Sequence, residues 1–105
     1  MTLHMLLSKD DAGDYMVSSL STGWSDLLGV GMSELVSMPL TTLIERFVHP
    51  DDVEGTQQAA GALLVDASAV VDFVNRYRTP DGWATLTWHA FAFGGDLHAT
   101  ATVDQ

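Results

Sequence analysis

The sequence of 105 residues contains no cysteine, and only four lysine and arginine residues stand against fourteen aspartate and glutamate residues. Without cysteine the chain has no disulfide, no thiolate nucleophile and no cofactor attached through sulfur. The net charge of -10 repels phosphate backbones and anionic membranes, so we expect neither nucleic acid nor a membrane as a partner. No apolar run approaches the ~20 residues that cross a bilayer, and no basic residue precedes the short apolar patch at 5–7. These features predict a cytoplasmic location.

A chain of this length forms one domain with its own core. Apolar runs at 3–8 and 14–18, joined by the turn residues KDDAG, predict a β-hairpin. Short helical pieces follow between residues 20 and 47, and the last of them, TTLIERF, can begin from a threonine cap. Residues 70–104 are rich in β-branched and aromatic residues and are divided by PDG and GG, which predicts three further strands.

The stretch FVHPDDVEG, residues 47 to 55, predicts the start of a longer helix. His49 serves as the cap residue and Pro50 takes the first helical position, where a missing N–H costs nothing. The two aspartates that follow complement the helix dipole. The helix is predicted to continue to about residue 66. Its apolar residues Val53, Ala60 and Leu64 are expected to lie on one side, which packs against the sheet.

Two tight turns set the expected register of the last three strands, one at Asp81-Gly82 and one at Gly94-Gly95. The pairs counted from these turns are Tyr77 with Leu86, Asn75 with Trp88, Phe73 with Ala90, Ala92 with Leu97, Ala90 with Ala99, Trp88 with Ala101 and Leu86 with Val103. Both hairpins then place their apolar residues on the same face, although a slip of one residue would turn a whole strand over. The sequence therefore predicts an α+β fold, in which one face of a five-stranded antiparallel sheet is covered by short helices and one longer helix.

Four short motifs give the sequence a family resemblance. They are LLGVGMSEL (27–35), HPDD (49–52), RYRTPDG (76–82) and TVD (102–104). In this order and spacing they resemble a PAS domain, most closely the subfamily common in bacterial sensor proteins. The resemblance implies that residues 1–105 form one sensory domain that is part of a larger signalling protein. It also implies a non-catalytic input module, which senses a ligand or relays a signal to an output domain such as that of a two-component histidine kinase.

The sequence leaves the cofactor unknown. Relatives that form a flavin adduct need a cysteine, which is absent, and haem-sensing relatives carry a histidine on the long helix, whereas residues 53–66 contain none. A non-covalently held flavin is left open. No spacing of acidic, serine and histidine residues suggests a catalytic group, so we expect no enzymatic activity. His89 and His98 are predicted to be diagonal neighbours on the outer face of the sheet; two solvated histidines are favoured over a metal site.

The candidate ligand site lies on the inner face, where Asn75 interrupts an apolar surface. A buried amide needs a hydrogen-bond partner. That partner is either a polar group of a ligand or one of three structural alternatives. These are a helix backbone group, a tyrosine hydroxyl and a trapped water. Four alanines (Ala90, Ala92, Ala99 and Ala101) leave volume that bulky side chains or a ligand must fill. The predicted ligand-binding residues are Phe73, Asn75, Tyr77, Trp88, Ala90 and Ala99.

The outer face carries an aromatic cluster at Phe91 and Phe93 on an otherwise polar surface. Apolar clusters on a solvent-exposed face are typical of contacts with another chain. We therefore expect a homodimer that uses this face or the N-terminal strand. The alternative function is accordingly a ligand-free module for dimerisation.

Overall fold

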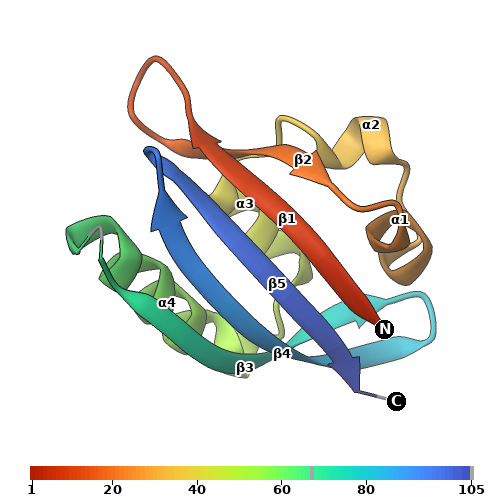
Figure 1. Ribbon diagram of the computed structural model, residues 1–105. Coiled ribbons are helices and arrows are strands. Elements are labelled where there is room, and N and C mark those ends of the chain that lie inside the picture. Colours follow the sequence, from red (N-terminus) through yellow and green to blue (C-terminus); the bar gives the residue numbers. More distant parts are fainter. Residues whose placement is uncertain (67, 105) are drawn as a thin grey trace.

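Five antiparallel strands form one sheet in the order β2-β1-β5-β4-β3, and the predicted α+β architecture is confirmed (Figure 1). The computed structural model describes residues 1–66 and 68–104. The elements are β1 (Thr2–Lys9), β2 (Tyr15–Leu20), α1 (Gly23–Leu28), α2 (Met32–Leu35), α3 (Leu40–Phe47), the 3-10 turn η1 (Pro50–Asp52), α4 (Val53–Val65), β3 (Val70–Thr79), β4 (Gly82–Phe93) and β5 (Asp96–Asp104). Strands β1 and β5, the first and last in the sequence, pair with each other in the interior of the sheet.

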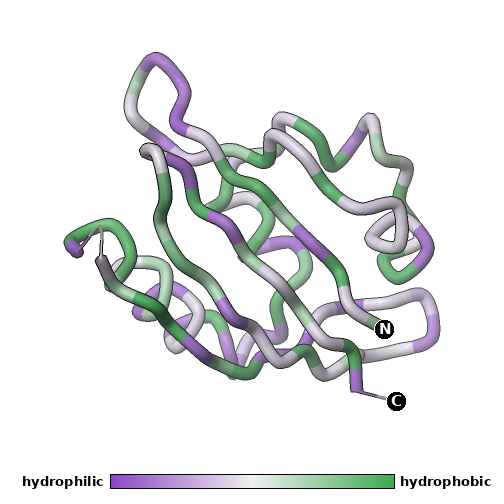
Figure 2. The backbone as a smooth tube through the Cα atoms, viewed as in Figure 1, coloured by the Kyte–Doolittle hydropathy of each residue, from purple (hydrophilic) through white to green (hydrophobic). Residues whose placement is uncertain are grey.

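The strands alternate between buried and exposed residues, most regularly in β1 and β5. Figure 2 shows the hydropathy changing repeatedly along these strands. Successive side chains of a strand point to opposite faces, so this alternation buries one face and leaves the other wet. Helices α3 and α4 lie on one side of the sheet (Figure 1). The predicted burial of Trp88, Ala90 and Ala99 on the inner face is confirmed.

The register of the β4–β5 hairpin is as predicted, whereas that of the β3–β4 hairpin differs by two residues. Ala90 pairs with Ala99 and Leu86 with Val103, but Asn75 pairs with Leu86 instead of Trp88. The reason is the turn: Thr79 pairs with Gly82, so the two loop residues are Pro80 and Asp81. Proline favours the second position of a type I turn and glycine the fourth, which places the turn one residue earlier. A shift of two residues preserves the face of every side chain.

The helices differ from prediction in two details. Helix α3 begins at Leu40 with Pro39 as its N-cap and without a side-chain cap, so the expected threonine cap is wrong. In α4 the buried residues are Thr56, Ala59 and Leu63, whereas Leu64 is 54% exposed. Counting only apolar residues selected the wrong stripe, because the true stripe includes a polar threonine.

The segment around His49 covers the free edge of β3. The His49 ring accepts a hydrogen bond from the Asp51 backbone N–H at 3.1 Å, which confirms the predicted cap. The His49 N–H donates to the Arg76 carbonyl at 2.8 Å, and the Arg76 N–H donates to the Asp52 carboxylate at 2.9 Å. This stretch therefore both starts a helix and satisfies the outward-facing backbone groups of an edge strand.

The other edge strand, β2, is covered in a similar way by the segment that precedes α3. The Val17 N–H donates to the Met38 carbonyl at 2.9 Å, and the Ser37 N–H donates to the Val17 carbonyl at 2.7 Å. Ser37 adopts a positive φ of 72° at this contact. Each edge of the sheet is thus paired with a loop at one position.

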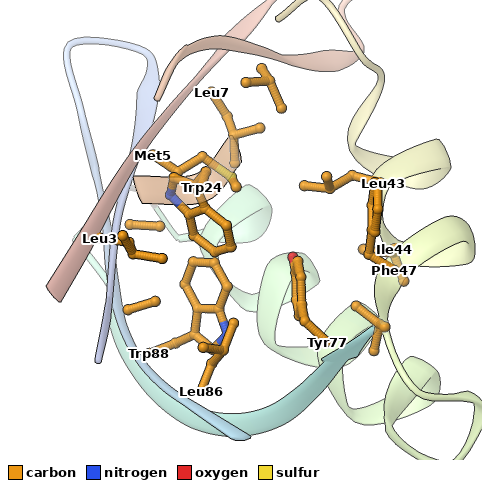
Figure 3. Close-up of a cluster of buried hydrophobic side chains, with 14 of the residues drawn as sticks. Leu3, Met5, Leu7, Trp24, Leu43, Ile44, Phe47, Tyr77, Leu86 and Trp88 are labelled. Carbon is orange, nitrogen blue, oxygen red and sulfur yellow. The ribbon is translucent and has the colours of Figure 1, made fainter. Parts of the chain in front are cut away.

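An aromatic cluster forms the centre of the core (Figure 3). Trp24 is fully buried, and its ring lies 5.5 Å from that of Trp88 and 5.6 Å from that of Tyr77. The Trp24 indole N–H donates to the His4 carbonyl at 3.0 Å. Within residues 1–66 and 68–104, no helix is long and apolar enough to cross a membrane.

Candidate ligand cavity in the core

A small cavity lies between the sheet and helices α3 and α4. Its volume is ≈ 50 Å³. All six residues predicted for the ligand site line it: Phe73, Asn75, Tyr77, Trp88, Ala90 and Ala99. The wall is completed by Met5, Leu7, Leu40, Leu43, Ile44, Thr56, Ala60, Leu63 and Leu97. The cavity is therefore mostly apolar and has three polar side chains, those of Thr56, Asn75 and Tyr77.

The Asn75 side chain is satisfied by the protein. Its amide is 2% exposed, accepts a hydrogen bond from the Trp88 indole N–H at 2.7 Å and donates one to the Thr56 hydroxyl at 3.0 Å. The Thr56 hydroxyl in turn donates to the Asp52 carbonyl at 2.8 Å. Of the two alternatives for the buried amide, these contacts favour a structural role, and the partner is a helix side chain together with an indole.

The hydrogen-bond chain ends in an ion pair near the surface. The Asp52 carboxylate accepts two hydrogen bonds from the Arg76 guanidinium, at 2.9 and 3.0 Å, in addition to that from the Arg76 backbone. The side-chain hydrogen bond from Arg76 lowers the pKa of Asp52, and partial burial opposes this effect. Arg76 follows Asn75 directly, so adjacent residues of β3 contact the core network and the surface ion pair.

Tyr77 behaves differently from the other polar residues of the wall. It is 3% exposed, and its hydroxyl oxygen points into the space between the tryptophan pair and the side chains of α3 (Figure 3). Burial raises the pKa of the Tyr77 phenol, which keeps it neutral. Among the described residues, the side-chain hydrogen bonds of the cavity wall involve Thr56, Asn75 and Trp88 but not this hydroxyl.

Solved structures with the same arrangement of strands and helices come from distant proteins. The PAS domain of the quorum-sensing receptor RpfR from Cronobacter turicensis, in complex with BDSF, matches with a TM-score of 0.79 and 9% identity over 99% of this chain and 94% of that chain. Cycle PAS-B of Drosophila melanogaster with bound ethylene glycol gives a TM-score of 0.70 and 14% identity, covering 97% of each chain. The chain has the PAS fold.

A third PAS-fold neighbour is the LOV domain of a blue-light activated histidine kinase from Erythrobacter litoralis, with a TM-score of 0.69 and 12% identity over 96% of this chain and 94% of that chain. No protein-family model and no curated protein matches the sequence. At these identities the likeness concerns the fold alone. It confirms the PAS architecture that the four sequence motifs indicated.

A flavin or haem does not fit the cavity of this PAS fold with its side chains as they stand. Cofactor pockets measure about 300 to 1,000 Å³, whereas this cavity measures ≈ 50 Å³. Most of the space over the four inner alanines is filled by protein. Of these four alanines, Ala90 and Ala99 line the cavity, whereas the half-buried Ala92 and the fully buried Ala101 lie outside its wall.

Sequence reasoning did not assign to the site the wall residues that come from the helices, nor Met5, Leu7 and Leu97 of the sheet. Thr56, Ala60 and Leu63 recur at helical spacing in α4, which is a signal that could have been used. Leu43 and Ile44 belong to the buried side of α3. Trp24, which supports the wall through Trp88, lies in a helix of six residues that is too short for a periodic pattern.

On the outer face of the PAS sheet the aromatic cluster is present. Phe91 is half-buried and stacks on His98 at 5.2 Å, while Phe93 is 72% exposed. His89 and His98 are diagonal neighbours as predicted, because His89 pairs with Thr100 and His98 with Phe91. The His89 ring lies 2.7 Å from the Asp72 carboxylate. Within the described residues no group of three or more potential ligands could hold a metal ion.

Proposed function

We propose that this chain is the sensory input module of a larger signalling protein and that a small molecule bound in the core cavity is its signal. The observation that carries the proposal is the cavity itself, which lies between the sheet, α3 and α4 and is lined by apolar side chains with a few polar groups. The RpfR PAS domain in complex with BDSF and Cycle PAS-B with bound ethylene glycol lend support from the same fold.

The module itself is non-catalytic in this proposal and relays occupancy of the cavity to an output domain elsewhere in the parent protein, such as a histidine kinase. The Trp88–Asn75–Thr56 hydrogen bonds connect the cavity wall to the start of α4 and to the Asp52–Arg76 pair. A ligand that moves Trp88 would therefore strain contacts that reach the surface. The acidic, cysteine-free composition supports a cytoplasmic location.

Filling the cavity should abolish ligand binding. Ala99→Val adds two methyl groups to a central strand at the cavity wall, whereas Ala92→Val adds the same groups on the same face outside the wall. We expect a concentrated small-molecule extract of the protein's own cells to raise the melting temperature of the wild type and of Ala92→Val. The same extract should leave the melting temperature of Ala99→Val unchanged.

Two results would count against ligand sensing in this cavity. An equal rise for Ala99→Val would show that the molecule binds elsewhere. A wild-type protein whose melting temperature no cell extract raises would favour the second candidate function, a ligand-free dimerisation module.

The exposed Phe93 ring is the observation that favours dimerisation as a second candidate. We expect Phe93→Asp to shift a dimer toward monomer by at least tenfold in dissociation constant, because the charge would be buried in an apolar contact. Val65→Asp is the matched control, since Val65 is 87% exposed at the end of α4, away from the outer face. Sedimentation equilibrium measures both. A wild type that stays monomeric at high concentration would contradict a dimer through this face.

A further inference from the structure

On the mostly apolar wall of the cavity, the Tyr77 hydroxyl forms no hydrogen bond with any of the described residues. The other two polar side chains of the wall are occupied, because Asn75 bonds to Thr56 and Trp88, and Thr56 bonds to the Asp52 carbonyl. Within the described chain, no side-chain oxygen or nitrogen is both sealed inside the protein and unpartnered. Tyr77 lines the cavity, and Figure 3 shows its oxygen directed between the tryptophan pair and the side chains of α3.

Packing fixes the direction of this hydroxyl. The Tyr77 ring lies 5.6 Å from Trp24, 6.5 Å from Phe47 and 5.7 Å from Trp88, in a nearly parallel stack with Phe47. With aromatic neighbours on several sides and 3% exposure, the ring cannot turn its hydroxyl toward solvent without disturbing the core. An unmade hydrogen bond at a buried hydroxyl is unfavourable, so an oxygen placed near it would be stabilised.

Water is a poor occupant of this cavity. A buried water is held by two to four polar partners, whereas Tyr77 is the one polar side chain among the described wall residues that bonds to no protein group, and its surroundings include Met5, Leu43, Leu63 and Leu97. A molecule with an apolar body would contact these side chains favourably and would need only one polar atom to satisfy Tyr77.

An anion is also a poor occupant. Among the described residues that line the cavity there is no lysine, arginine or histidine. A carboxylate there would be buried without a counter-charge, in a chain whose net charge is already -10.

Building on the proposed function, we propose that the cavity takes a neutral, mostly apolar molecule whose single oxygen bonds to the Tyr77 hydroxyl, as in a short-chain alcohol or ketone. The cavity of ≈ 50 Å³ sets its size at about four non-hydrogen atoms, at roughly 10 to 15 Å³ each. For so small a ligand the dissociation constant is on the order of tens of micromolar at the tightest and lies in the millimolar range for an ordinary fit.

The test is an NMR titration of the chain with 1-propanol, followed through the backbone and methyl signals of Ala90 and Ala99. Sodium propionate, at matched ionic strength, is the charged counterpart of the same chain length. We expect saturable shifts with 1-propanol and none with propionate. Tyr77→Phe keeps the ring and removes only the hydroxyl, and it should weaken 1-propanol binding by about three- to tenfold.

Tyr15→Phe is the matched control. Tyr15 is the other tyrosine of the chain, and its hydroxyl donates to the Gly95 carbonyl at 3.3 Å, outside the cavity wall. Its removal should leave 1-propanol binding unchanged. Both variants should retain the dispersed spectrum of the wild type, since neither removes a buried ring.

Each part of the inference can fail separately. Equal affinity of wild type and Tyr77→Phe would overturn the role of the hydroxyl, and propionate binding as tightly as 1-propanol would overturn the neutral ligand class. Shifts that persist in Ala99→Val would place the probe outside the cavity and overturn the inference as a whole. If 1-propanol behaves as expected while no cell extract raises the melting temperature of the wild type, the cavity chemistry stands and the sensory function proposed above fails.

Discussion

Replacing Trp24 by alanine should lower the free energy of unfolding by about 3 to 5 kcal/mol, the largest loss we expect from any single substitution. The residue is fully buried, stacks on Trp88 and Tyr77, and donates its indole N–H to the His4 carbonyl in β1. Truncation would open a cavity at the centre of the core and leave that carbonyl without its indole donor. Urea unfolding followed by circular dichroism measures the change.

Trp83→Ala provides the matched control for this truncation. Trp83 is 45% exposed on β4 and contacts the His49 ring at 4.5 Å and the Arg78 guanidinium at 5.6 Å. Its loss should cost at most about 1 kcal/mol, as expected for contacts at a surface. Similar losses for the two variants would mean that Trp24 does not form the centre of the core.

Asn75→Leu should lower the free energy of unfolding by about 2 to 3 kcal/mol. Leucine has as many side-chain non-hydrogen atoms as asparagine, so no packing contact is removed, but the Trp88 indole N–H would lose its acceptor in a buried site. Thr56 would lose a donor yet keep its own bond to the Asp52 carbonyl, so most of the cost should come from the indole. Denaturant unfolding again measures the loss.

A double-mutant cycle separates this cause from a general packing effect. Trp88→Phe removes the indole N–H, so in the Asn75→Leu background it should cost clearly less than it does in the wild type. Thr56→Ser retains the hydroxyl, so it should lower the free energy of unfolding less than Asn75→Leu or Trp88→Phe does. Strict additivity of Asn75→Leu and Trp88→Phe would argue that the hydrogen bond contributes nothing.

The β4–β5 register could be counted from sequence because the turn signal is unambiguous. Gly94 and Gly95 both adopt positive φ, at 62° and 86°, as a two-residue hairpin turn requires. In PDG two turn signals overlap, an Asp-Gly pair and a proline-led turn, and the structure has the second, with Pro80 and Asp81 as the loop residues. The residues predicted for the inner face were still correct, because the register error of two residues equals the side-chain period of a strand.

The cavity wall could be predicted from the sheet side only. Asn75, Phe73 and Tyr77 are placed by strand alternation, which is a local property of the sequence. The positions of Trp24 and Leu43 relative to the sheet depend on how short helices pack across long sequence separations, and no local pattern fixes that. Thr56 was missed because a polar residue was excluded from the buried stripe of α4.

The loops that cover the two edge strands have a consequence for how copies of this chain can associate. A strand from another molecule that approached β3 would meet the Arg76 N–H and carbonyl already bonded to Asp52 and His49. At β2 it would meet Val17 bonded to Met38 and Ser37. A continuous intermolecular ladder, the first step of domain swapping and of fibril growth, is interrupted on both sides. The protein should therefore tolerate high concentrations without edge-to-edge aggregation, even though β-strands make up much of its chain.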